Sequence, residues 1–302
     1  MEKKIIFHAD DFGANEEISR HILDCHIKGA LSSLSVLPNG THLEKCMEML
    51  KPYRQKISVS VHFNLAEGHC LADPASVPLL VNERGMFCIS FFKVLLLSFT
   101  GKRKELKRQI RAEMSAQLER MVPYVDTLRI DSHQHYHMIP VVFSGILGAV
   151  AEMRKKYPEK PLPVEFVRIP AEPVTPFLKH PAFYATYKPI NLVKNIVLNV
   201  LNIMDRRLLA PYRTRSAVFF GILLSGKMDI RRVSALLPDF EKIAARRGLP
   251  LEVLCHPGGV RTPEELMDRE NKDCVDFYMS EGRRIEKNMM LKIKEKALRS
   301  SR

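Results

Sequence analysis

The chain lacks paired cysteines of the kind that bind metals or carry out redox reactions. None of its six cysteines forms a C-x-x-C pair, which argues against a zinc knuckle and against a dithiol redox site. Scattered cysteines without a disulfide framework are typical of a reducing compartment. We therefore expect a cytoplasmic protein with free thiols at Cys25, Cys46, Cys70, Cys88, Cys255 and Cys274.

The chain also lacks an apolar run long enough to cross a bilayer. The first apolar run, residues 5–7, is too short for a signal peptide, and Asp10 and Asp11 follow it closely. Residues 87–99 are strongly apolar, but they include Lys93 and fall short of the ~20 residues that a spanning helix needs. The sequence therefore predicts neither a signal peptide nor a transmembrane helix.

Acidic residues are in the minority. The chain has 34 Asp and Glu against 47 Lys and Arg, which gives a formal charge of +13 and a pI near 9.5. This balance suggests an anionic partner such as nucleic acid, anionic lipid or a phosphorylated substrate, although a basic surface can also serve solubility alone. Because no nucleic-acid-binding motif is present, no nucleic-acid partner is expected.

What the chain does have is a regular alternation of strand-like and helix-like patterns. Strands are predicted at 5–8, 31–37, 57–64, 127–131, 164–169, 217–224 and 251–255. Helices are predicted at 16–28, 42–50, 105–121, 141–156, 229–247 and 280–297. Repeated β–α alternation means a parallel sheet, and the length favours barrel-like closure. We expect an α/β fold, a TIM-barrel-like (β/α) barrel that need not be complete, as one domain over residues 1–302.

Two apolar segments, 87–108 and 190–215, interrupt the alternation as insertions. The first ends in a basic run, and the second contains an amphipathic helical pattern followed by Arg206 and Arg207. One side of that helix carries Asn191, Lys194, Asn195, Asn199 and Asn202. Three interpretations remain open: helices packed on the barrel, a homodimer contact, or interfacial helices at an anionic membrane surface.

The run from His8 to Gly13 places two adjacent carboxylates at the end of the first buried strand. Burying both is costly unless something compensates their charge. A metal ion on one carboxylate would do so and would leave the other free as a proton acceptor. The alternative is a simple turn in which an aspartate caps the next helix.

Histidines stand at the ends of three other predicted strands, where barrel enzymes collect their catalytic groups. His62 and Asn64 are two residues apart, His133, His135 and His137 alternate, and His256 precedes a Pro-Gly-Gly loop. One Asp with two His would form a divalent metal site with open positions. A metal-bound water, a carboxylate base and a His acid together indicate a hydrolase of an amide or ester.

The four clusters, in this order, resemble the YdjC/ChbG family of carbohydrate deacetylases. The matching motifs are HADDFG from His8, HFNLAEG from His62, DSHQHYH from Asp131 and CHPGG from Cys255. The resemblance implies a TIM-barrel-like fold and removal of N-acetyl groups from sugars such as chito-oligosaccharides, with one divalent metal ion, Mg²⁺ or Zn²⁺.

Carried over position by position, the resemblance also implies roles for single residues. The metal ligands would be Asp11, His62 and His133, with Asp10 as general base and His256 as general acid. Supporting or substrate-binding positions would be Asn64, His135, His137 and Arg168. Arg168 would orient Asp10 or contact substrate, or would form only a surface ion pair.

The sequence departs from the family pattern at His8, where many relatives have Asn, and in its two apolar insertions. Because basic residues adjoin those insertions, we expect the acetylated amino sugar to be either a chito-oligosaccharide or an N-acetylhexosamine linked to a lipid, with the protein peripheral at the inner membrane face. The alternatives are a metal hydrolase of another amide or a phosphoester, and a membrane-surface or anionic-ligand-binding protein on the same barrel.

Overall fold

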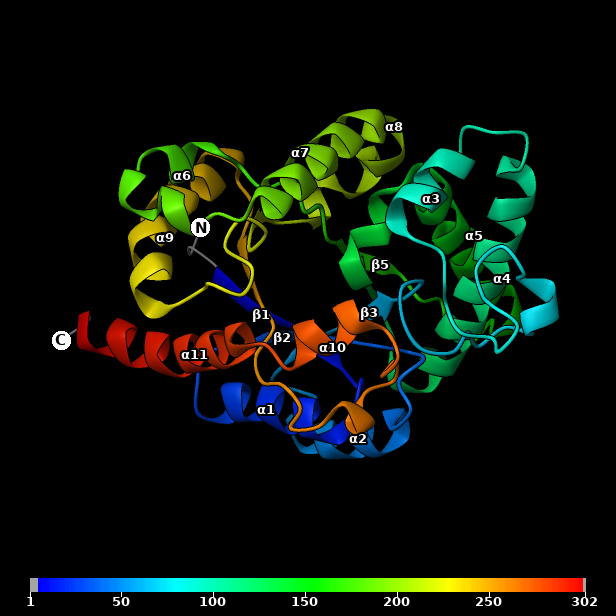
Figure 1. Ribbon diagram of the computed structural model, residues 1–302, viewed down its shortest axis with the longest axis horizontal. Helices are drawn as coiled ribbons and strands as arrows, with labels where there is room; N and C mark the ends of the chain where they lie inside the picture. Colours follow the sequence, from blue (N-terminus) through cyan, green and yellow to red (C-terminus); the bar gives the residue numbers. More distant parts are fainter. Residues whose placement is uncertain (1–4, 301–302) are drawn as a thin grey trace.

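Seven parallel strands form one curled sheet in the computed structural model, which describes residues 5–300, and side chains up to residue 293 (Figure 1). Their order across the sheet is β5-β4-β3-β2-β1-β7-β6. The strands are β1 (Ile5–Phe12), β2 (Ser33–Val36), β3 (Ser58–Phe63), β4 (Leu128–Ser132), β5 (Val164–Val167), β6 (Val218–Phe220) and β7 (Leu251–Cys255). The expected α/β fold is confirmed, and the barrel is incomplete: within residues 5–300, β5 and β6 are unpaired edges of a half-barrel.

Helices connect the strands and surround the sheet in Figure 1. They are α1 (Glu16–Ile27), α2 (Leu43–Leu50), α3 (Phe91–Leu97), α4 (Arg103–Met121), α5 (Pro140–Lys156), α6 (Thr175–Leu178), α7 (Pro189–Met204), α8 (Arg206–Leu209), α9 (Ile230–Arg247), α10 (Lys272–Tyr278) and α11 (Glu281–Ser300). Short 3₁₀ helices are η1 (Lys51–Tyr53), η2 (Pro74–Ser76), η3 (Val122–Tyr124), η4 (His133–Met138), η5 (Pro181–Thr186), η6 (Ala210–Arg215) and η7 (Pro263–Glu265).

The first strand is longer than its apolar run predicts. It continues past His8 to Phe12, so both aspartates lie within the sheet rather than after it. The pairing of β1 with β2 shifts register between Ala9 and Phe12, and Asp11 adopts a left-handed φ of 71° there. The apolar pattern ends at the first aspartate, whereas the strand continues because both carboxylates find partners inside the half-barrel.

Side chains rather than strand pairing hold the two edges of the half-barrel together. The Arg215 guanidinium donates a hydrogen bond of 2.8 Å to the carbonyl of Val164 on β5. The buried Glu172 carboxylate, just after β5, accepts backbone N–H groups that follow β6, from Gly221 at 2.6 Å and Leu223 at 2.9 Å. The crossover that contains α6, α7 and α8 spans this gap (Figure 1).

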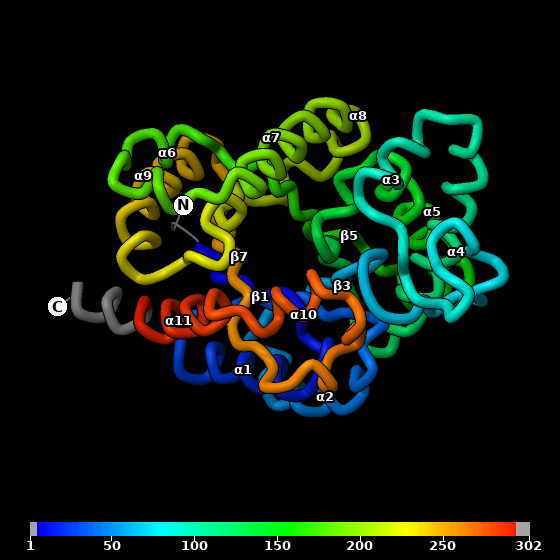
Figure 2. Tube along the Cα trace, viewed as in Figure 1, coloured from blue at the N-terminus to red at the C-terminus, as the bar shows by residue number. Residues whose placement is uncertain are grey.

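The C-terminal helix returns to the start of the chain. Figure 2 shows α11 running beside α1, and Lys287 on α11 donates a hydrogen bond of 3.0 Å to Asp24 on α1. This packing brings the start of α11 to the carboxyl end of β1, so Arg283 reaches Asp11 although 272 residues separate them in sequence.

Candidate active site

Asp10 is held by an arginine from another strand. Arg168, which follows β5, donates from Nη1 and Nη2 to the two Asp10 oxygens, both over 2.9 Å, and from Nε to Glu252 on β7, also over 2.9 Å. Arg168 is fully buried and is therefore not part of a surface ion pair. Although burial raises the pKa of Asp10, Arg168 and His62 lower it well below its usual value, so Asp10 is ionised at neutral pH.

Asp11 has different partners from Asp10, and only one of its two carboxylate oxygens has a hydrogen-bond partner. Its Oδ2 accepts a hydrogen bond of 2.9 Å from Arg283, while its buried Oδ1 has no hydrogen-bond partner. That oxygen lies 3.2 Å from Nδ1 of His133 and 3.8 Å from Nε2 of His62. Burial opposes the charge of Asp11, but His133 and Arg283 lower its pKa well below the usual value.

His62 is oriented by a buried carboxylate behind it. Its Nδ1 donates to Asp131 Oδ1 over 2.7 Å, and Asp131 also accepts a hydrogen bond from the hydroxyl of Ser35. Burial raises the pKa of Asp131, but Arg168 and His62 outweigh it and bring the pKa to about 2. With Nδ1 so engaged, Nε2 of His62 points into the cluster and has no hydrogen-bond partner.

His133 begins η4, directly after β4. Glu67 lies on its far side, with Oε2 at 3.7 Å from Nε2 of His133, and accepts a hydrogen bond of 2.7 Å from the Tyr278 hydroxyl. Burial disfavours the charged ring, yet the carboxylates of Glu67 and Asp11 raise the pKa of His133 to about 9. The cluster thus stabilises positive charge at this position.

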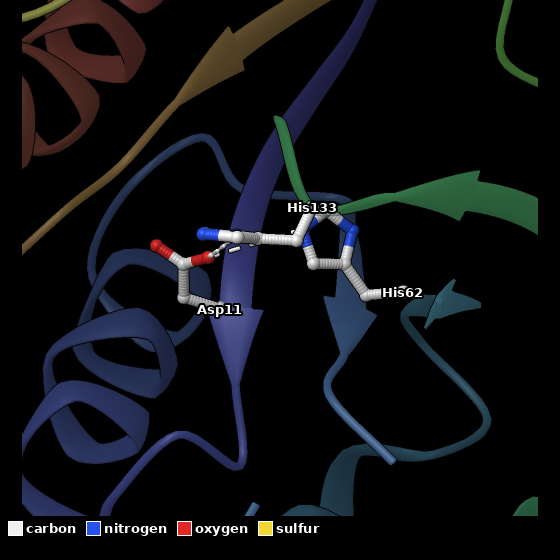
Figure 3. A group of neighbouring side chains, drawn as sticks. All are labelled: Asp11, His62 and His133. Carbon is white, nitrogen blue, oxygen red and sulfur yellow. Dashed lines mark ion pairs between the residues drawn. The ribbon is translucent and has the colours of Figure 1, made fainter. Parts of the chain in front are cut away.

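These three side chains could hold a metal ion. Asp11, His62 and His133 each offer a ligand atom within 4.8 Å of the others, and Figure 3 shows the three side chains converging. Two buried atoms without a hydrogen-bond partner, Asp11 Oδ1 and His62 Nε2, support a metal ion at this place, because both lie where the three side chains converge. Asp131 behind His62 is the carboxylate–histidine arrangement common behind metal ligands.

A second group of His8, Asp10 and Asp131 also lies within 4.8 Å. It is a poorer metal site because the Arg168 guanidinium already pairs with both carboxylates, at 2.9 Å from Asp10 and 3.2 Å from Asp131. His8 hydrogen-bonds the Ser35 hydroxyl at 2.6 Å. This group is therefore an ion-pair network that supports the first one.

His256 approaches the cluster from the loop after β7. Its Nε2 lies 4.0 Å from Asp10 Oδ2, and its backbone N–H donates to Glu286 over 2.6 Å. The ring packs edge-on against Phe277, with centroids 5.3 Å apart. His256 is more exposed than the other members, so it lines the open side of the cluster.

The remaining expected residues have mostly supporting contacts. Asn64 turns away from the cluster and stabilises the loop that carries Glu67, since its Oδ1 accepts from the backbone of Ala66 and its Nδ2 donates to the carbonyl of Glu67, both over 2.8 Å. His137 is buried, which lowers its pKa to about 4, and its Nε2 lies 2.9 Å from the carbonyl of Arg168. His135 packs edge-on against Phe219 and has an unpartnered Nδ1.

Sequence reasoning missed five charged residues that complete the site. Each is a single carboxylate or guanidinium with no motif of its own, and each became visible only through a contact across the fold: Glu67, Asp131, Glu252, Arg283 and Glu286. The sole signal was position, because Glu67 and Asp131 stand inside the motifs that contain His62 and His133.

The fold and the cluster define an α/β half-barrel protein with a buried Asp–His site at the carboxyl ends of its strands. The chain belongs to the family of YdjC-like proteins, whose family model matches residues 4–294. This confirms the family resemblance drawn from the four motifs.

The chain is also similar to proteins of known name. The chain is 29% identical over 281 residues to a carbohydrate deacetylase of Mus musculus, covering 86% of this chain and 79% of that protein. It is 28% identical over 149 residues to a chitooligosaccharide deacetylase of Serratia marcescens, covering 47% of this chain and 54% of that protein, so the second match spans about half of its relative.

A crystal structure has the same fold. A protein of Enterococcus faecalis V583, described as a candidate cellobiose-phosphate cleavage protein, superposes with a TM-score of 0.62 over 99% of this chain and 95% of its own. At 18% identity this likeness concerns the fold alone.

Proposed function

We propose that this protein is a metal-dependent hydrolase that removes N-acetyl groups from an acetylated amino sugar. The observation that carries the proposal is the buried group Asp11, His62 and His133, with two unpartnered ligand atoms, next to an ionised Asp10. The mouse and Serratia relatives, named as carbohydrate and chitooligosaccharide deacetylases, support the sugar substrate and the acetyl group.

Asp11, His62 and His133 would hold one divalent ion, and their mixed carboxylate and imidazole donors suit Zn²⁺ or Mg²⁺ in that order. When bound, the ion supplies Lewis-acid chemistry that polarises the acetamide carbonyl and acidifies a water molecule. Asp131 fixes the ring of His62 so that Nε2 faces the ligand space. Arg283 holds the second oxygen of Asp11 and leaves Oδ1 for coordination.

Asp10 would act as the general base. A carboxylate with a lowered pKa is a weak base on its own, so it suits a water that is already acidified nearby. Its two hydrogen bonds from Arg168 fix the direction from which the proton is accepted. His256, on the open side of the cluster, would donate a proton to the sugar nitrogen as the amide bond breaks.

The direct test is acetate release from N,N′-diacetylchitobiose with added zinc or magnesium and with EDTA. Metal-dependent acetate release is expected from the wild type. Asp10→Asn should abolish turnover while the metal stays bound, and His62→Ala should lose the metal itself. Metal binding without acetate release from any amino sugar would contradict the deacetylase assignment and point to another acyl group.

A further inference from the structure

The buried side of helix α7 is half polar, since Asn191 and Asn195 are buried there together with Leu198 and Leu201. Asn191 and Asn195 are buried against the barrel, and Asn191 donates to the carbonyl of Leu223 over 3.4 Å. The opposite side carries exposed apolar residues, among them Ile196, which is 55% exposed, and Ile203, which is 71% exposed. A helix of a globular protein normally exposes few large apolar side chains, so the exposed apolar side of α7 indicates a partner that covers it.

A second exposed apolar face lies on and just after α3. Phe92, Leu96 and Phe99 follow one another at helical spacing, and Leu96 and Phe99 are both 67% exposed. The inner side of the same helix packs into the protein through the buried Val94. Two insertions that are far apart in sequence thus both present large apolar side chains to the outside.

Both helices adjoin η4, the element that begins with His133. From the α3 side, the ring of Phe91 packs edge-on against Tyr136 with centroids 5.3 Å apart, and the Tyr136 hydroxyl donates to the carbonyl of Ile89 over 2.9 Å. From the other side, α7 packs against η4 directly. In Figure 1 both helices lie on the same side of the molecule, above the strands. The two helices that carry the apolar faces therefore both border the element that begins with His133.

The exposed charged residues of the two segments that carry these faces are basic. Residues 88–104 contain no acidic residue, and residues 173–215 contain one, Asp205, which is buried. Exposed basic residues stand beside both faces: Lys93, Lys102, Arg103 and Lys104 near α3, and Lys188, Arg206 and Arg207 near α7. Apolar residues bordered by Lys and Arg are the combination that binds the surface of an anionic bilayer.

We propose that the faces of α3 and α7 dock on an anionic phospholipid membrane. A second copy of the chain is the less suitable partner, because an isologous contact would bring the Arg206 and Arg207 edge against itself without acidic partners. Within the described part of the chain, no helix is long and apolar enough to span a bilayer. The contact is therefore peripheral, with the apolar side chains in the headgroup region and the basic ones on lipid phosphates.

Docking in this way also bears on the identity of the substrate. This second inference rests on the proposed deacetylase function. Since α3 and α7 both contact η4, the bilayer would face the side of the molecule where His133 lies. An acetylated amino sugar carried on a membrane lipid would then reach the cluster without leaving the bilayer surface.

The docking test is cosedimentation with vesicles of phosphatidylcholine alone and of phosphatidylcholine mixed with phosphatidylserine. The wild type should bind the mixed vesicles only, and less at high salt. The double variant Ile196→Asp/Val200→Asp should bind about tenfold more weakly. The matched control is Ile27→Asp on α1, an apolar residue that is 48% exposed on another face, and its binding should equal that of the wild type.

Absence of wild-type binding to the mixed vesicles would overturn the proposal. So would equal loss in the Ile27→Asp control, or a wild-type dimer in solution that Ile196→Asp/Val200→Asp turns into a monomer without any vesicle binding. Circular dichroism and thermal midpoints show whether each variant is folded, and the exposed positions should tolerate the change.

The substrate consequence has its own readout. Acetate release from polyprenyl-linked N-acetylglucosamine in anionic vesicles should fall in Ile196→Asp/Val200→Asp, while release from soluble diacetylchitobiose stays unchanged. Turnover of the soluble sugar with none of the lipid-linked sugar would overturn the lipid-borne substrate and leave the deacetylase function standing. If the wild type released acetate from neither sugar, the proposed deacetylase function would be overturned, whereas the result of the vesicle cosedimentation would still stand.

Discussion

The Arg168 guanidinium, which follows β5, donates a hydrogen bond of 2.9 Å to each of the two carboxylate oxygens of Asp10 on β1. The two residues are 158 positions apart and both are buried. Glu252 also fixes the position of the guanidinium, because it accepts a hydrogen bond of 2.9 Å from Nε of Arg168. The carboxylate proposed as base is thus ionised and held in one orientation.

Replacing Arg168 by Lys should show whether Asp10 needs the fixed orientation that Arg168 gives it or only a nearby positive charge. An ammonium keeps the positive charge but cannot make the two-point contact, so Asp10 loses its fixed direction. We expect kcat to fall about a hundredfold with little change in KM and with the metal still bound. Steady-state kinetics beside metal analysis measures this. Wild-type kcat in Arg168→Lys would show that the two-point contact is not needed.

Asp131→Asn tests the carboxylate behind His62. Because the Asp131–His62 hydrogen bond of 2.7 Å sets the ring's orientation, its weakening should lower metal affinity by about 10- to 100-fold. Asp126→Asn is the matched control, since the Asp126 side chain is 93% exposed. Titration with a competing chelator measures both affinities, and unchanged affinity in Asp131→Asn would contradict the proposed role of His62.

Metal addition should stabilise the fold through the same three residues. A ligand that is present at ~100 times its dissociation constant and binds only the native state adds about 2.7 kcal/mol, which for a chain of this size raises Tm by roughly 4 °C. Thermal unfolding with zinc, magnesium or EDTA measures the shift. His62→Ala should not respond. An equal shift in wild type and variant would place the stabilising metal elsewhere.

Glu172 should make stability depend on pH. Burial raises its pKa from 4.5 to about 7, although the backbone N–H groups of Gly221 and Leu223 act in the opposite direction. A raised pKa in the folded state contributes stability that is present below the unfolded pKa and is lost as pH rises through about 7. The expected loss is on the order of 3 kcal/mol.

Glu172→Gln removes the titration and leaves a side chain of the same shape. Denaturant unfolding from pH 5 to 8 should show the wild type losing stability relative to this variant across the window. Parallel curves for the two proteins would mean that Glu172 titrates in the ordinary range.

Much of the fold was predictable because it depends on local pattern. All six predicted helices and all seven predicted strands are present, because hydrophobic periodicity and turn residues involve only neighbours in sequence. The strand after residue 217 is shorter than predicted, as β6 ends at Phe220. There, Gly221 and the following N–H groups bind Glu172 instead of a neighbouring strand.

The four motifs likewise placed Asp10, Asp11, His62 and His133 at strand ends that come together, although their chemical roles stay predictions.

Sequence alone therefore predicted the α/β alternation, the family and the motif residues Asp10, Asp11, His62 and His133, but not the charged residues around them. Tertiary structure decided which charges meet, as in the pair of Asp11 with Arg283, and which side of α7 is buried. An amphipathic pattern specifies two faces of a helix but not which one meets the protein. Here Leu198 and Leu201 are buried together with Asn191, and Asn191 and Asn199 donate to the carbonyls of Leu223 and Glu172 at the rim of the barrel. Contacts over such distances leave no local pattern in the chain.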